Sequence, residues 1–334
     1  MRFAIVSTHD IHGGGIRFDC SKDDCTSFLS WLHHLDGIHF NYNELRAQGD
    51  EVLKEFDLVM MSGHPSFIVD IIRIGKFLKG SRTVSMFYPE GSTQLYDNSI
   101  RGFHPEYYEA WRACDVLSMA EEDKRSYYEA FVTLRTIVRF IHVPTSPGMA
   151  DGLFFLERHM KANRAVVYGD NNPNHPLIAT ACARDVGLEI TAVECGDAEI
   201  ERAIGPDVRV RRLPKLSQNA FLLELSRSVL HFYPTEWIGT ARQVISCAAV
   251  GTPCIGSNMS HTQRRLFPDL SFGAYDVHMM KWAAKKLLED KFYYSYIANK
   301  AKEALDFYSL PAAKKRMTEA YRDAVKNRLQ TVYA

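Results

Sequence analysis

Apolar and polar positions follow two different periods along this chain. Short apolar runs rich in β-branched residues are separated by longer stretches in which apolar residues recur with a helical period. This alternation predicts parallel strands joined by crossover helices, and therefore an α/β fold. In the first half, strands are predicted at Arg2–Ser7, Leu58–Ser62, Thr83–Phe87, Val116–Met119 and Ile137–His142. Helices are predicted there at Asp24–His34, Ser66–Leu78 and Glu121–Phe131.

A Pro- and Gly-containing break at Pro144–Gly148 precedes a second series of the same kind. Its strands are predicted at Arg164–Tyr168, Glu189–Val193, Val208–Arg211, Val229–Tyr233 and Pro253–Gly256. Its helices are predicted at Pro176–Val186, Asn219–Ser226, Ala241–Ala249, Met279–Leu288 and Tyr293–Phe307, with a last helix at Ala312–Arg328. We therefore expect two Rossmann-like, doubly wound domains over residues 1–150 and 151–310, facing each other across a cleft, and a C-terminal segment over residues 311–334.

Length and charge agree with this organisation. The chain has 334 residues, 46% of them hydrophobic, which is enough for two cores of ordinary size. Lys and Arg together number 40, and so do Asp and Glu. This balance argues against a generally basic nucleic-acid coat but leaves local basic patches open.

The cysteines and the N-terminus indicate a cytoplasmic protein. Seven cysteines are scattered without a CxxC pair or a zinc-ligand spacing, at positions Cys20, Cys25, Cys114, Cys182, Cys195, Cys247 and Cys254. We interpret them as reduced thiols. The first strand turns polar at Ser7, too early for the apolar core of a signal peptide, and no later segment approaches the roughly 20 apolar residues of a membrane span.

Glycine-rich and polar loops follow the predicted strands, where open parallel sheets bind their ligands. The first such loop contains His12, Gly13, Gly14 and Gly15, whose backbone N–H groups can approach an anion closely. A flexible turn is the competing interpretation. The chain has neither GxGxxG nor GxxxxGK[ST], which removes the main support for a dehydrogenase or a P-loop kinase.

The most informative stretch runs from Pro234 to Pro253, from a strand end through a loop and a helix into the next strand. It resembles, without a gap, the donor-site segment of family-four and related retaining glycosyltransferases, which have the GT-B fold. The matching residues are Pro234, Thr235, Gly239, Ala249, Gly251, Thr252 and Pro253. The resemblance implies two Rossmann-like domains, a nucleotide sugar (UDP-linked by preference) bound by the second domain, and a last helix that crosses back to the first. It also implies that the chemistry needs no bound metal or other cofactor.

Three family features are replaced in this chain. The two family glutamates fall on Ile238 and Ser246, and the second loop glycine falls on Ala241. The Arg/Lys pair for the pyrophosphate is absent, because Gly169–His175 stands in its place. Loss of the glutamates leaves open a non-catalytic protein that binds sugar nucleotides, and a sugar-nucleotide epimerase is the nearest enzymatic alternative.

Residue chemistry suggests replacements in the donor site. Arg242, at the start of the helix after the loop, offers a fork of donors and a permanent charge to a leaving diphosphate. Glu236 and Ser246 can hydrogen-bond sugar hydroxyls. The other predicted donor-binding residues are Gly169, His175, Lys215, Gly239, Thr240 and Ala241.

The predicted acceptor side lies in the first half. His64 and Glu90 each follow a predicted strand, where a base for an acceptor hydroxyl is expected, although a structural role is the alternative. The helix at Ser66–Leu78 and its end carry Arg73, Lys76 and Lys79, either as a solvated face or as a contact for a polyanion such as DNA or anionic lipid. A glycan, a lipid-linked glycan, a protein and a modified DNA base all remain as acceptors.

Overall fold

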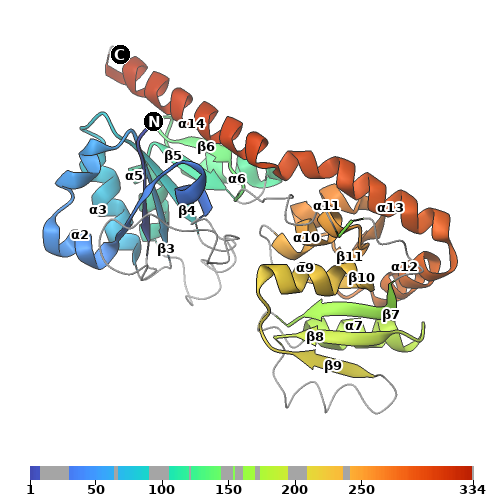
Figure 1. Cartoon of the computed structure of the whole chain (residues 1–334). Helices are drawn as coiled ribbons and strands as arrows, with labels where there is room; N and C mark the ends of the chain where they lie inside the picture. Colours follow the sequence, from blue (N-terminus) through green and yellow to red (C-terminus); the bar gives the residue numbers. More distant parts are fainter. Residues whose placement is uncertain are drawn as a thin grey trace. The chain divides into compact units, whose positions relative to one another are not determined.

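The computed structural model describes residues 1–7, 30–63, 67–89, 105–119, 122–143, 153–154, 161–169, 174–194, 209–235 and 241–332. The chain forms two compact units (Figure 1). The first contains Met1–Thr145 and Leu310–Ala334, and the second contains Ser146–Ser309. The sequence pattern predicts boundaries after residues 150 and 310, and the acceptor and donor roles of the two halves stay predictions.

The first unit is built on a six-stranded sheet in which every pairing is parallel. Its strands are β1 (Phe3–Ser7), β2 (Ile38–Asn41), β3 (Leu58–Gly63), β4 (Val84–Pro89), β5 (Val116–Met119) and β6 (Ile137–Phe140), in the order β2-β1-β3-β4-β5-β6. Its helices are α1 (Ser30–His34), α2 (Tyr42–Gln48), α3 (Ile68–Leu78), α5 (Pro105–Ala113), α6 (Arg125–Phe131) and α14 (Leu310–Val332), with 3-10 turns at Glu51–Glu55 and Glu122–Lys124.

The second unit repeats this plan. Its six-stranded parallel sheet contains β7 (Ala162–Tyr168), β8 (Glu189–Val193), β9 (Val210–Leu213), β10 (Ser228–Tyr233), β11 (Cys254–Ser257) and β12 (Ser271–Phe272), in the order β12-β11-β10-β7-β8-β9. Its helices are α7 (Asn174–Arg184), α9 (Gln218–Ser226), α10 (Arg242–Val250), α11 (His261–Leu266), α12 (Val277–Glu289) and α13 (Lys291–Ala304), with 3-10 turns at Pro268–Leu270 and Leu305–Tyr308.

The central strands are apolar on both faces because helices cover a parallel sheet from both sides. All five residues of β1 and all four of β5 are buried, and so are five of the six in β10. A continuous apolar run is therefore the signature of these strands, and it explains why their positions agree with the predicted ones.

The sequence pattern did not predict β2, β12, α2, α5 or α11. Strand β2 has only four residues, Ile-His-Phe-Asn, and the buried His39 ring on it lies 2.8 Å, Nε2 to Oγ, from Ser7 on β1. Helix α2 begins with a capping box, in which the Asn41 side chain accepts from the backbone while the Glu44 carboxylate accepts from Asn41 N–H. The Asn-x-x-Glu spacing was the available signal. The predicted helix over residues 24–34 is described only from Ser30 onward, as α1.

Helix α14 packs on the first unit, as predicted, and completes its core (Figure 1). Ala313, Met317, Ala320 and Ala324 are buried in one apolar cluster with residues of the first sheet, and Tyr321 packs against it partly buried. The small side chains let the helix backbone come close to the sheet. None of the described helices is long and apolar enough to cross a membrane.

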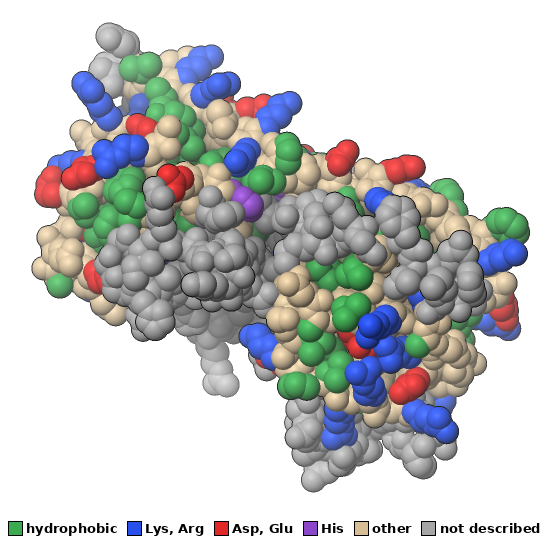
Figure 2. All heavy atoms as spheres, viewed as in Figure 1, with side chains coloured by type: hydrophobic (Ala, Val, Ile, Leu, Met, Phe, Trp, Pro, Cys, Tyr) green, Lys and Arg blue, Asp and Glu red, His purple; other side chains and the backbone are tan. Residues whose placement is uncertain are grey.

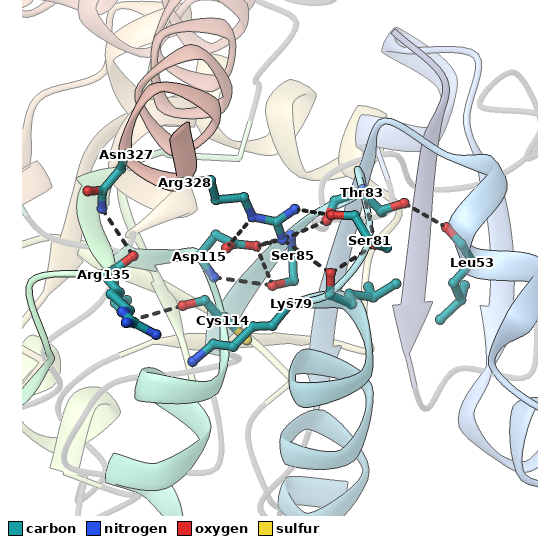
Figure 3. A network of polar contacts seen from close by, with 12 residues as sticks. Leu53, Lys79, Ser81, Thr83, Ser85, Cys114, Asp115, Arg135, Asn327 and Arg328 are labelled. Atoms are coloured by element: carbon teal, nitrogen blue, oxygen red, sulfur yellow. Dashed lines mark hydrogen bonds and ion pairs between the residues drawn. The ribbon is translucent and has the colours of Figure 1, made fainter. Parts of the chain in front are cut away.

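A charged network fixes the far end of α14 (Figure 3). Arg328 donates to both carboxylate oxygens of Asp115, at 2.7 and 2.5 Å, and to the backbone oxygens of Ser81, Leu78 and Thr83. Asp115 also accepts at 2.8 Å from the backbone N–H and the hydroxyl of Ser85. One guanidinium thus joins the last helix to the segment between α3 and β4 and to Asp115 before β5.

Candidate donor site at the carboxyl edge of the second sheet

The second sheet reverses its winding between β7 and β10, which are neighbours in the sheet although far apart in sequence. Open α/β sheets bind ligands outside the carboxyl ends of their strands at such a point. The two loops with predicted donor-binding residues follow these two strands, one after Tyr168 and the other after Tyr233. The topology therefore brings the two predicted halves of the donor site to one place.

Helix α10 begins at this edge. Arg242 is its first residue and is exposed, and Ala241 precedes it as a buried N-cap without a side-chain hydrogen bond. The first turn holds no acidic residue. The positive end of the helix dipole is thus not balanced by an acid of its own first turn, which is the electrostatic condition for holding a phosphate.

The second half of the Pro234–Pro253 motif has a structural role. Gly251 ends α10 in the left-handed conformation, with φ of 68°, and its backbone N–H bonds back into the helix. A Cβ at this position would lie 2.9 Å from the Phe154 ring. The Thr252 hydroxyl donates to Leu225 O at 2.8 Å, which ties the turn to α9. Glycine is therefore required here by the turn and by packing.

The buried Lys161 side chain bonds to the same turn. Its ammonium donates to Thr252 Oγ1 at 2.8 Å and to Gly251 O at 3.2 Å, at the negative end of α10. Burial lowers the pKa of Lys161 to about 8. This lysine was not among the predicted residues. It bonds at the C-terminal end of α10, whereas the donor is expected at the N-terminal end of that helix.

Ser246 lies in the middle of α10 and is buried. Its hydroxyl oxygen accepts at 3.1 Å from the side-chain amide of Gln218, the first residue of α9. Gln218 is a polar group at this site that the sequence did not suggest, because its partner is 28 residues away and on another helix.

The remaining described donor candidates differ in position. Gly169 directly follows β7, and its N–H donates to Val193 O at 2.9 Å. His175 lies in the first turn of α7, buried, with its ring centroid 6.3 Å from that of Tyr233. Lys215 is exposed on the segment between β9 and α9. Gly169 and His175 thus lie at the carboxyl ends of β7 and β10, whereas Lys215 lies on the segment before α9.

Several predicted residues lie outside the described part of the chain. In the second unit they are Glu236, Gly239 and Thr240, and in the first unit they are His12, Gly13, Gly14, Gly15, His64 and Glu90. The strands before the first-unit candidates are described. These strands are β1, β3 and β4, which are consecutive in the first sheet, so their carboxyl ends lie side by side at that sheet's own switch point.

The cations on and after α3 are engaged with neighbouring groups. Arg73 pairs with Asp50 and Asp70, and Lys76 pairs with Glu109 on α5. The Lys79 ammonium donates to Arg112 O at 2.7 Å. On the face shown in Figure 2, basic and acidic side chains likewise lie side by side over the first unit. This arrangement favours the solvated-face interpretation of the helix over the polyanion contact.

Comparison with solved structures shows which known proteins share this fold. No protein-family model and no curated protein sequence matches the chain. Among solved structures, an alpha-glucosyltransferase in complex with UDP-glucose and DNA containing an abasic site matches with a TM-score of 0.63 and 10% identity, over 97% of this chain and 99% of that one. Sucrose-phosphate synthase from Thermosynechococcus elongatus matches with a TM-score of 0.64 and 14% identity, over 84% and 76%.

A third match is S. aureus TarM, solved as a mutant with fondaparinux, alpha-GlcNAc-glycerol and UDP. Its TM-score is 0.63 at 10% identity, over 84% of this chain and 58% of that one. At these identities the likeness concerns the fold. With two parallel α/β units and a last helix packed on the first unit, the chain has the GT-B fold of the glycosyltransferases that it resembles.

Proposed function

We propose that this protein is a glycosyltransferase that moves a sugar from a nucleotide sugar, UDP-linked by preference, to an acceptor hydroxyl. The observation that carries the proposal is the start of α10. An exposed arginine and a helix N-terminus with no acidic residue in its own first turn lie beside the switch point of the second sheet. The fold supports it, since the matched alpha-glucosyltransferase and TarM structures carry UDP-glucose or UDP.

In the proposed reaction the bond between the anomeric carbon and the β-phosphate oxygen breaks while the acceptor oxygen bonds to that carbon. The leaving diphosphate gains negative charge as the bond breaks. Arg242 and the first N–H groups of α10 stabilise this charge, which lowers the barrier because they interact more strongly with the leaving group than with the intact donor. The acceptor proton passes to a base, for which His64 and Glu90 are the candidates of the first unit.

The other candidates contact the donor rather than the reacting atoms. Gly169 allows close approach of the first loop to the diphosphate, and the pair Ser246–Gln218 offers hydrogen bonds to the ribose. Lys215, which is exposed just before α9, is proposed to contact the nucleotide. Because the family glutamates are absent, we expect the sugar to be held by other groups, with Glu236 the candidate in the same loop.

The acceptor is proposed to be a modified base in DNA that carries a hydroxyl group. The support is the match over nearly the full length of both chains to an alpha-glucosyltransferase solved with DNA. The paired state of Arg73, Lys76 and Lys79 argues that a DNA contact uses other residues. A triple serine variant of these three should therefore keep the salt dependence of DNA affinity of the parent. A flattened dependence would return them to the interface.

The donor site is tested by calorimetric titration of UDP and UDP-sugars into the full chain. Arg242→Ala should weaken UDP binding about tenfold to hundredfold, the value of one charged hydrogen bond. Arg227→Ala is the matched control, because Arg227 is exposed at the start of β10, at the opposite edge of the same sheet. Equal weakening by both variants, or by neither, would contradict this placement of the diphosphate.

Turnover separates the proposed reaction from its alternatives. UDP release that depends on added acceptor, with the sugar recovered on the acceptor, is the expected result. Interconversion of the UDP-sugar without acceptor would indicate an epimerase. Tight binding of the nucleotide with no turnover over the whole acceptor panel, which includes DNA with hydroxymethylated bases, glycans and lipid-linked glycans, would indicate a binding protein.

A further inference from the structure

Three potential metal ligands come together in the core of the second unit. His231 lies on β10, Cys254 starts the neighbouring strand β11, and Cys247 lies on α10, which packs on both strands. His231 and Cys254 are paired residues in the parallel register, so their side chains share one face of the sheet. The helix brings Cys247 to that face. The group thus joins two strands and the helix over them.

The geometry of the group is compact. The three ligand atoms, one imidazole nitrogen and two sulfurs, all lie within 4.8 Å of one another, and each residue has an exposed fraction of 0%. A tetrahedral zinc centre with Zn–S bonds of ~2.3 Å places two sulfurs about 3.8 Å apart. With Zn–N bonds of ~2.0–2.1 Å, sulfur and nitrogen lie about 3.6 Å apart in such a centre, so contractions of about 1.2 Å or less would bring all three to bonding distance.

An unsatisfied imidazole points to a ligand. Neither ring nitrogen of His231 has a hydrogen bond of regular geometry in the described part of the chain, although the Gln243 side chain and the Val166 backbone lie near the buried ring. Buried polar groups of native proteins nearly always have a partner, because an unpaired one costs on the order of 1–3 kcal/mol. Packing alone accounts for two buried thiols, which behave as small apolar groups, but it does not account for a buried imidazole beside them.

We propose that His231, Cys247 and Cys254 bind one Zn²⁺ ion. The donor set suits a thiophilic cation, since thiolate and imidazole are the ligands that zinc takes in structural sites. Charge favours zinc in particular. Two thiolates and a neutral imidazole around Zn²⁺ carry no net charge, whereas the same set around Cu⁺ would leave a negative charge in the core.

Binding of the ion exchanges protons for metal. Each thiol loses its proton to solvent as its sulfur bonds to zinc, and the imidazole binds through a lone pair without losing one. The three side chains supply three of the four ligands of a tetrahedral centre, and because they are buried the ion enters as the chain folds and its role is structural. It ties α10, which carries Arg242, to the sheet below.

The test uses the full chain without an affinity tag. The protein is unfolded in guanidinium with a thiol reductant and chelator, then refolded with Zn²⁺, with Cu⁺ or with chelator alone. The expected result is about one zinc per chain by elemental analysis and a higher melting temperature for the zinc-refolded protein than for the chelator-refolded one. If the unsubstituted protein refolds without retaining zinc, the proposal is overturned. This measurement of zinc content requires no substituted protein.

Variants assign the ligands. Cys247→Ala/Cys254→Ala should lower zinc content at least about tenfold and abolish the effect of chelator on the melting temperature. Cys114→Ala/Cys182→Ala is the matched control, because both of these thiols are buried but lie outside the group. Equal zinc in both double variants would overturn the assignment. Preferential retention of Cu⁺ over Zn²⁺ would overturn the choice of zinc.

Discussion

Replacement of Arg328 by methionine tests how the last helix is held. The change keeps much of the apolar length of the side chain and removes the guanidinium, which makes five hydrogen bonds to Asp115 and to three backbone oxygens. The Asp115 carboxylate, whose side chain is 8% exposed, then keeps only its two bonds from Ser85. A buried carboxylate is left without its countercharge.

The magnitude follows from this geometry. Loss of one partner of a buried ion pair costs about 3–5 kcal/mol. The lower part of this range is expected here, because the Arg328 side chain is 21% exposed and Ser85 continues to satisfy Asp115. For a domain of this size, ~3 kcal/mol corresponds to a fall in melting temperature of about 6–12 °C.

Scanning calorimetry of the full chain measures the effect, and the transition of the first unit should fall while that of the second stays unchanged. Arg322→Met is the control, since Arg322 is exposed on the same helix. Adding Asp115→Asn to Arg328→Met should recover part of the loss, because no charge then remains buried. A shift as small as that of the control would refute the reasoning that this pair anchors the helix.

Three further predictions concern single side chains. Met317→Ala should cost the first unit about 2–5 kcal/mol by leaving a cavity under α14, measured by urea denaturation. Gly251→Val should lower the melting temperature of the second unit, since it combines a left-handed backbone with a Cβ only 2.9 Å from the ring of Phe154; an unchanged value would contradict the cap. Burial lowers the pKa of Lys161 to about 8, so between pH 8 and 10 this lysine is protonated in the unfolded chain and neutral in the folded one. The free energy of unfolding should therefore rise by about 1.4 kcal/mol per pH unit in the parent relative to Lys161→Met. Parallel curves of unfolding free energy against pH for the two proteins would refute this prediction.

The apolar periods predicted the central strands because burial on both faces of a parallel sheet leaves a continuous signal in sequence. The same reasoning was less successful at the polar edges. Strand β2 contains His39, whose partner is Ser7 on another strand, so its stability does not show in its own composition. Helix α11 has an N-cap serine that was visible in the sequence: the Ser260 hydroxyl accepts from Gln263 N–H at 3.4 Å.

The candidate donor site was predictable as far as it depends on loops that follow strands. Arg242 could be placed at the start of a helix from the motif alone. That Ser246 is bonded to Gln218, and that Lys161 is bonded to Thr252, could not be predicted, because each pair joins elements that only the packing of α9, α10 and β7 brings together.

The sequence by itself determined the α/β class, the succession of the main strands along the chain, and the loops at their carboxyl ends, since these follow from local periods and turn chemistry. Tertiary structure alone decided which distant polar groups meet. Arg328 and Asp115 are 213 residues apart, and His231, Cys247 and Cys254 have no recognised metal-ligand spacing. The reason is physical: burial imposes a period on neighbouring residues, whereas contacts between distant residues depend on the strand order, which no local pattern encodes.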